Sequence, residues 1–178
     1  LISAVDLDSI TTMGFRGEAL YSLAAVAEVS LLTRTADQES AVFLEARNGS
    51  VSRQEPRGGP IGTTVSVNNL FAQIPARKKF LKTPKSELAR IHTVMTHYSL
   101  AHPDVRFNLL TDGRTSFSSP GNGDLRAAIA AVYNRGVAQA LLAVESLSET
   151  GIKVSGLVSA PDLYRANRSY ISLYVNQR

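Results

Sequence analysis

The sequence of 178 residues predicts an α+β fold, in which helices cover one face of a sheet. Runs of β-favouring residues recur along the chain, as at 29–35 and 41–47. Asn48-Gly49 and Asp112-Gly113 each separate two such runs, which is the strongest short signal for a hairpin. Helix-favouring segments lie between the strands, and 44% hydrophobic residues supply an ordinary core. The length suffices for one full domain or two small ones.

The first part of the chain predicts a helix followed by strands. A helix is expected over 17–26, with a core-facing stripe formed by Leu20, Leu23, Ala24 and Ala27. Strands follow at 29–35, 41–47 and 51–53. The stretch 55–62 holds two prolines and three glycines and predicts a loop, and 63–67 then predicts a buried strand.

The middle of the chain predicts a basic connector at 75–81 and a long helix. Thr83 and Pro84 suit the N-cap and first turn of this helix, which should end before Pro103. Its expected buried face carries Leu88, Ile91, Met95 and Tyr98. The three histidines, His92, His97 and His102, are five residues apart and so do not converge on a metal; we interpret them as structural or solvent-facing.

A domain boundary is predicted in the linker-like stretch 118–123, which divides the chain into 1–119 and 120–178. Before it, 105–110 and 114–118 form the second expected hairpin. After it, Asp124 can cap a helix that stops near Gly136. Strands are then expected at the three segments 138–144, 152–159 and 169–175.

The composition limits the classes of protein. There are no cysteines, which excludes disulfides and thiolate zinc sites. No apolar run approaches the roughly 20 residues that cross a bilayer, and the N-terminus lacks the layout of a signal peptide. We therefore expect a cytoplasmic protein without a membrane partner.

Two stretches are candidate binding sites. Gly14 and Gly17 run into helix-favouring sequence, so backbone N–H groups there could grip a phosphate, although a simple tight turn is the alternative. Cations crowd together further along, where they could meet a phosphodiester backbone or only form a solvated surface. They are Arg77, Lys78, Lys79, Lys82, Lys85 and Arg90.

Three motifs together closely resemble the MutL family of DNA mismatch repair proteins, within the GHKL ATPase superfamily. They are the string 14–20 (GFRGEAL), the string 62–65 (GTTV) and the string 75–81 (PARKKFL). The resemblance extends from about residue 1 to Asn176. It implies a partial two-layer α/β sandwich of the GHKL ATPase type over 1–119, followed over 120–178 by part of a ribosomal protein S5-like α/β transducer domain.

The resemblance also implies roles for individual residues. It maps Gly14, Phe15, Arg16 and Gly17 onto backbone that meets the terminal phosphates of ATP, and Thr63 onto the position beneath the adenine. Glu18 is a candidate catalytic base, but because it lies at a helix N-terminus we expect it to be a capping carboxylate. Arg77, Lys78 and Lys79 are the expected DNA contacts.

The family's ATPase chemistry needs more than this sequence holds. The glutamate that activates water, the asparagine that holds Mg²⁺ and the Asp-x-Gly-x-Gly string have no match here. We therefore expect a part of a longer protein that is inactive alone, whereas the intact protein would be a weak ATPase that uses ATP with Mg²⁺. By resemblance, it would close as a homodimer and relay signals between a MutS-like mismatch-recognition protein and downstream repair factors on DNA, at the nucleoid if bacterial.

Two other interpretations remain open. One is another ATPase of the superfamily, such as a type II topoisomerase subunit, against which the string 75–81 argues. The other is a nucleotide-independent nucleic-acid-binding module. Two departures from the family pattern are Gln73, in place of an asparagine, and Gln177, in place of a glycine, which puts a turn at Gln177 in doubt.

Overall fold

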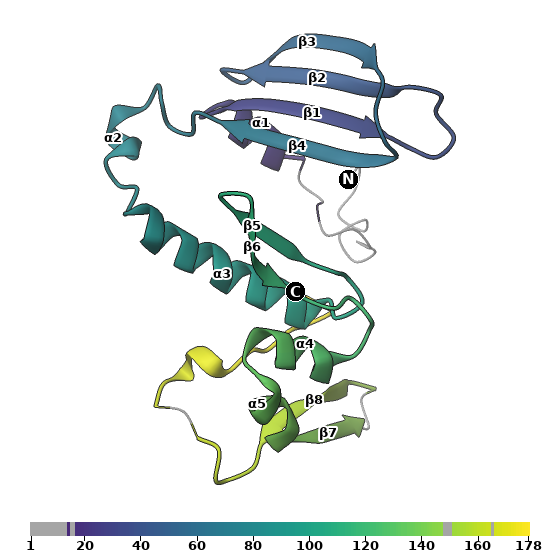
Figure 1. Ribbon diagram of the computed structural model, residues 1–178, viewed down its shortest axis with the longest axis vertical. Helices are drawn as coiled ribbons and strands as arrows, with labels where there is room; N and C mark the ends of the chain where they lie inside the picture. Colours follow the sequence, from purple (N-terminus) through teal and green to yellow (C-terminus); the bar gives the residue numbers. More distant parts are fainter. Residues whose placement is uncertain (1–13, 15–16, 148–150, 165) are drawn as a thin grey trace. The chain divides into compact units, whose positions relative to one another are not determined.

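The computed structural model describes residues 14, 17–147, 151–164 and 166–178 (Figure 1). By their internal contacts, the residues form two compact units, Leu1–Lys82 and Thr83–Arg178. The domain boundary near residue 119 rests on sequence and stays a prediction. The first unit contains α1 (Ala19–Ala24), β1 (Glu28–Arg34), β2 (Ala41–Arg47), β3 (Ser50–Arg57), β4 (Gly62–Asn68) and α2 (Pro75–Lys78).

The sheet of the first unit has the strand order β3-β2-β1-β4 and is antiparallel throughout. The tight connection between β2 and β3 places Asn48 and Gly49 at φ 54° and 71°. Positive φ at both positions suits the turn of a two-residue hairpin, so the predicted hairpin is confirmed. β2 has its predicted bounds, and β1 begins and ends one residue before its predicted limits.

The register gives this sheet two different faces. Val29 pairs with Ala46 and Val67, Leu31 pairs with Leu44 and Val65, and Thr33 pairs with Val42 and Thr63. Because directly paired residues share a face, these nine side chains form one surface, which we call the apolar sheet face. The opposite face carries Phe43, Glu55 and a larger share of charged groups.

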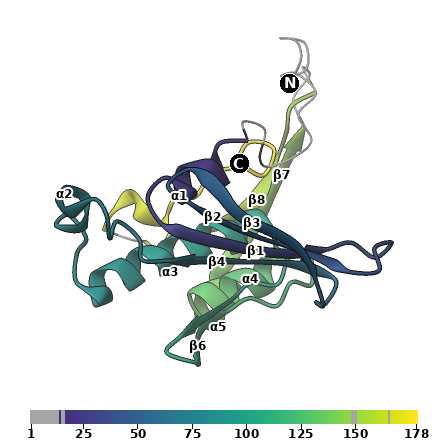
Figure 2. The same ribbon diagram turned by 90° about the horizontal axis from the view of Figure 1, so that it is seen from above.

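Helix α1 lies against one face of this sheet (Figures 1 and 2). Its end is fixed because the backbone N–H of Gly49 donates to the Ala24 carbonyl at 3.0 Å. Ala24 and Ala27 are buried as expected, but Leu20 is exposed, so its predicted place in the core is wrong. The helix is also shorter than predicted, with six residues.

Two strand predictions in the first unit need correction. Residues 55–57 were expected in a loop, but they belong to β3, because Pro56 lies on an edge strand where its missing N–H is tolerated. β4 was expected to be buried, yet most of it is exposed. As the other edge of the sheet, β4 has a neighbour on one side only.

The second unit begins with a long helix. Its described elements are α3 (Pro84–Ala101), β5 (Asn108–Thr111), β6 (Arg114–Ser118), α4 (Leu125–Val132), α5 (Arg135–Ala140), β7 (Leu141–Leu147), β8 (Lys153–Ser159) and η2 (Arg168–Tyr170). The Thr83 hydroxyl accepts from the Ser86 backbone N–H at 3.3 Å, which confirms the N-cap. The buried residues of α3 are Ser99 and Leu100, whereas Ile91 and Tyr98 of the predicted face are exposed.

The core of the second unit lies where α4 and α5 meet the end of α3. Its buried residues are Leu100, Ala128, Ile129 and Ala138, and Leu141 and Leu157 pack on them from the β7–β8 pair. Asp124 caps α4 through the Arg126 N–H at 2.8 Å, as predicted. The β5–β6 hairpin is also confirmed.

Two predictions in the second unit are wrong. Gly136 was expected to end a helix, but Asn134 accepts from the Val137 N–H at 2.8 Å and starts α5, which occupies the beginning of the predicted strand 138–144. Residues 169–175 were expected to form a strand. Instead they begin in η2, and Tyr174 is tied by its hydroxyl to the His97 carbonyl at 3.0 Å.

Candidate nucleotide and phosphate sites

The glycine pair lies in exposed chain before α1. Gly17 has φ +67°, and a Cβ added there would meet no atom of the described residues within 4 Å. The backbone at Gly17 is therefore open to a ligand in a conformation that most other residues resist. Phe15 and Arg16 lie outside the described residues. Glu18 occupies the N-cap position, but its side chain makes no capping hydrogen bond, so the expected carboxylate cap is wrong.

Thr63 stands on the apolar sheet face at the start of β4. Its hydroxyl oxygen lies 2.8 Å from that of Thr33, the directly paired residue on β1. Either hydroxyl can donate, and each has one proton and two lone pairs. The contact therefore orients Thr63 and leaves its hydroxyl free to make a further hydrogen bond.

The surface beside Thr63 is apolar and open to solvent. Val65 and Val67 follow Thr63 on the same face and are 45% and 40% exposed. A flat apolar surface next to one oriented hydroxyl suits a planar heteroaromatic group, which stacks on the valines and hydrogen-bonds at its edge. The arrangement thus fits a nucleotide base.

The basic connector is anchored by an aromatic ring. The Phe71 N–H donates to the Val26 carbonyl at 2.8 Å, and the Arg77 guanidinium lies 5.9 Å from the centre of the Phe71 ring. α2 carries Arg77 and Lys78 in its last turn, and Lys79 is its C-cap. Within the described part of the chain, neither lysine has an ion-pair partner, so both charges are available to an anion.

The remaining cations of the predicted patch are split between the units. Lys82 ends the first unit, whereas Lys85 and Arg90 belong to α3 in the second. Arg90 lies 3.6 Å from Glu87, so its charge is partly neutralised. The structure therefore describes Arg77, Lys78 and Lys79 as a local set and leaves the larger patch a prediction.

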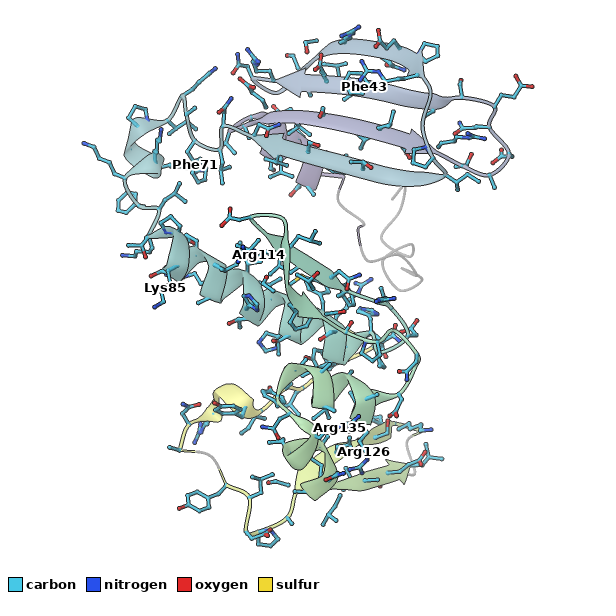
Figure 3. All side chains as sticks on the ribbon, in the orientation of Figure 1. Phe43, Phe71, Lys85, Arg114, Arg126 and Arg135 are labelled. Atoms are coloured by element: carbon cyan, nitrogen blue, oxygen red, sulfur yellow. The ribbon has the colours of Figure 1, made fainter. Side chains whose placement is uncertain are left out.

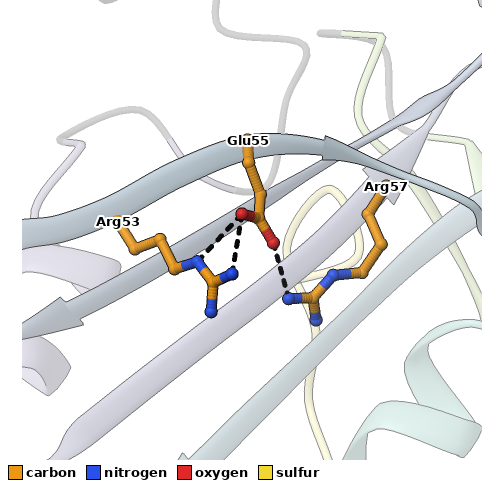
Figure 4. A network of polar contacts seen from close by, with 3 residues as sticks. All are labelled: Arg53, Glu55 and Arg57. Atoms are coloured by element: carbon orange, nitrogen blue, oxygen red, sulfur yellow. Dashed lines mark hydrogen bonds and ion pairs between the residues drawn. The ribbon is translucent and has the colours of Figure 1, made fainter.

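Charged residues on the opposite sheet face are engaged with one another. Glu55 binds Arg53 at 2.8 Å and Arg57 at 2.7 Å (Figure 4). The Arg57 guanidinium also lies 3.5 Å from the centre of the Phe43 ring. Hydrogen bonds from Arg57 and then Arg53 lower the pKa of Glu55 below its ordinary 4.5. The ion pairs lie within β3, and the contact of Arg57 with the Phe43 ring joins them to β2.

The described residues contain neither a metal site nor a membrane-spanning helix. No group of three or more histidine, cysteine and carboxylate residues is placed there to hold a metal ion. Nor does any described helix combine the length and apolar character that crossing a membrane requires. Among the histidines, His92 contacts the Phe117 ring edge-on and His102 stacks with Tyr98.

The sequence singled out Thr63 as a candidate but not its partner Thr33. The two residues are 30 positions apart, and their contact depends on the pairing of β1 with β4. No local sequence motif predicts that pairing. The sequence does contain one signal, since on each strand a threonine follows or precedes two aliphatic residues at alternate positions.

The comparison with protein families matches one model, described as DNA mismatch repair protein, C-terminal domain, over residues 129–178. Among curated relatives, the DNA mismatch repair protein MutL of Streptococcus uberis is 44% identical over 97% of this chain. MutL of Lactococcus lactis subsp. lactis is 42% identical over 98% of it. The chain spans about a quarter of the length of these relatives, 26% in each case.

Solved structures give the same result. The Aquifex aeolicus MutL ATPase domain complexed with ADP matches 89% of this chain and 60% of its own, with a TM-score of 0.69 and 26% identity. The N-terminal domain of a DNA repair protein matches 86% of this chain and 50% of its own, with a TM-score of 0.70 and 29% identity. These matches confirm the predicted mixed α/β fold of the GHKL ATPase type. The chain belongs to the MutL family of DNA mismatch repair proteins.

Proposed function

We propose that this chain supplies the base-contacting and phosphate-contacting surfaces of an ATP site, together with a DNA-binding connector, in a mismatch repair protein. The intact protein would hydrolyse ATP, close as a homodimer and relay mismatch recognition to downstream repair factors. The observation that carries the proposal is the Thr63 hydroxyl, held 2.8 Å from Thr33 on an open apolar face. The ADP complex of the Aquifex aeolicus relative supports the choice of an adenine nucleotide.

In this proposal the base and the phosphates of one nucleotide contact two places on the first unit. The base rests on Val65 and Val67 and hydrogen-bonds to Thr63. Backbone N–H groups around Gly17 meet the phosphates. α1 is only six residues long, so its dipole contributes little alone, and the close approach that a glycine at φ +67° permits matters more.

A magnesium ion is part of the chemistry that the family implies, but the described residues offer no cluster of ligands that fits one. We therefore assign no metal ligand and no hydrolytic step to this chain. Its residues bind and orient the nucleotide. The catalytic base and the metal ligand would be supplied by other parts of the intact protein.

The connector would bind DNA through charge. Lys78 and Lys79 are exposed and lack ion-pair partners among the described residues, and the backbone hydrogen bond from Phe71 to Val26 ties the preceding turn to the rest of the unit. Lysines that meet phosphates displace counterions, so binding should weaken steeply as salt rises. Such contacts carry no base specificity.

The nucleotide assignment is tested by Thr63→Val in the full-length protein, with binding of a non-hydrolysable ATP analogue measured by calorimetry. Loss of one hydroxyl with little change of shape should weaken binding by roughly two- to tenfold. Thr64→Val is the matched control, because Thr64 is the next residue of β4 and points to the opposite face. Equal effects of the two variants, or none, would contradict the assignment.

The DNA assignment is tested by reversing the charge of Lys78 and Lys79 to glutamate and titrating a duplex at several salt concentrations. Each lost phosphate contact should reduce the slope of log K against log salt by about 0.9. Unchanged affinity and slope would refute this assignment. If the protein binds DNA and this binding shows no dependence on nucleotide, the result would favour a nucleotide-independent nucleic-acid-binding module instead.

A further inference from the structure

The second unit contains an open groove that has an arginine at each end. It runs over α4, and its lining includes Arg106, Ser118, Pro120, Ala127, Ala131 and Arg135. No carboxylate lines it. We call it the two-arginine groove, and its volume is about 440 Å³.

Both arginines are unpaired within the described part of the second unit. Neither makes an ion pair or a side-chain hydrogen bond there, and both are exposed. Arg126, which precedes the groove on α4, behaves differently: its guanidinium donates to the Ala138 and Leu141 carbonyls and holds the start of β7. Arg106 and Arg135 therefore present two full charges that the fold does not use.

The backbone holds both ends of the groove firmly. At one end Gly121, at φ +66°, presses on Arg106 so closely that an added Cβ would lie 2.4 Å from the Arg106 nitrogen. Ser119 clamps the same loop, because its N–H donates to the Phe107 carbonyl at 2.8 Å and its hydroxyl accepts from the Phe107 N–H at 2.9 Å. At the other end Arg135 is the first residue of α5, whose N-cap Asn134 fixes its start (Figure 3).

The floor between the arginines is small and apolar. Ala127 and Ala131 are one turn apart on α4, so the helix presents methyl groups and no long side chain. A bulky polymer can approach such a floor closely while its anions reach the arginines.

We propose that the two-arginine groove binds the phosphodiester backbone of DNA, as a second contact separate in sequence from the connector at 77–79. This inference rests on the proposed function, in that it presumes a DNA-binding protein. The guanidinium groups would each meet a phosphate through charge-assisted hydrogen bonds, and sugars would face the alanine methyl groups. The contact positions DNA without reading its sequence.

The test is the double variant Arg106→Gln and Arg135→Gln in the full-length protein, titrated with a duplex over a range of salt. Affinity at low salt should fall roughly tenfold or more, and the salt slope should decrease by up to about 2. The control is Arg114→Gln with Arg168→Gln, which removes the same charge elsewhere in the unit; Arg114 lies on the β5–β6 hairpin, away from Arg135 (Figure 3). It should change neither quantity by as much.

The outcomes separate this inference from the proposed function. If reversal at Lys78 and Lys79 weakens DNA binding but the groove variant matches its control, the groove inference is overturned and the function stands. If the full-length protein does not bind DNA, both fail. If the groove variant instead loses binding to a polyglutamate peptide and keeps DNA affinity, the groove serves an acidic protein partner and our inference is wrong.

Discussion

The apolar residues beside Thr63 in the first unit differ in their surroundings from those in the core of the second unit. In the first, a row of aliphatic side chains lies on an open sheet face around Thr63, and Val65 and Val67 are about half exposed. In the second, Leu100, Ala128, Ile129 and Ala138 close into a core. An open apolar surface beside an oriented hydroxyl gains stability when a ligand covers it, whereas a closed core stabilises the fold alone. Substitutions beside Thr63 should therefore affect binding, whereas substitutions in the closed core should affect folding.

The largest effect is expected for Gly17→Val. Valine resists φ +67°, and its side chain would occupy the open space that a phosphate needs. We expect ATP-analogue binding by the full-length protein to fall below detection in calorimetry. Gly113→Val, at φ +75° in a hairpin of the other unit, is a control with similar strain. Unaltered affinity in Gly17→Val would rule out the phosphate contact.

Ile129→Ala should act on folding instead. Ile129 is 7% exposed within the closed core, and removing a buried isoleucine to alanine costs about 2–5 kcal/mol. Urea titration measures the change in the free energy of unfolding. Hydrogen exchange of the α4 amides then shows whether the loss lies in this core. Ile152→Ala is the matched control, because Ile152 is exposed in the same unit. A loss of α4 protection no greater than in the control would mean that this core is not closed.

The sequence could predict what is local. The hairpins at Asn48-Gly49 and Asp112-Gly113 and the caps Thr83 and Asp124 follow from neighbouring residues, and all were confirmed. The predicted strand at 169–175 was wrong because alternation alone does not supply a partner strand. The break at Gly136 was wrong because Asn134 restarts the helix two residues earlier.

The sites divide in the same way. Gly14, Gly17, Thr63 and the connector are short strings that a family resemblance can identify. Thr33 is brought to Thr63 by strand pairing across 30 positions, and Arg106 and Arg135, which are 29 positions apart, line the same groove. Both arrangements depend on the fold and on residues far apart in the sequence, so a local motif alone does not predict them.

Thr33→Val tests the nonlocal part of the open face. Thr33 is a positioning residue, since its hydroxyl orients Thr63 from the paired strand. Its loss should weaken ATP-analogue binding by about two- to threefold, less than the loss of Thr63 itself. Combined with Thr63→Val, it should add little, because the two act through one hydrogen-bonded pair. Additive losses in calorimetry would show that Thr33 acts independently of Thr63.

The smallest effect is expected at Glu55, on the far side of the same sheet. Arg57 and then Arg53 hold its pKa below the ordinary 4.5, so the folded state favours the carboxylate. The stabilisation is present above about pH 4.5 and is lost as pH falls through the lowered pKa. Glu55→Gln should therefore lower the thermal midpoint slightly at pH 7, because Glu55 is exposed and such pairs contribute little, and this difference should disappear as pH falls through the lowered pKa of Glu55. Glu39→Gln is the control for the thermal midpoint. The nucleotide affinity of Glu55→Gln should stay unchanged, because Glu55 and Thr63 lie on opposite faces of the sheet. A change in ATP-analogue binding would show that the two faces are coupled and would break the division between binding and folding surfaces within the first unit.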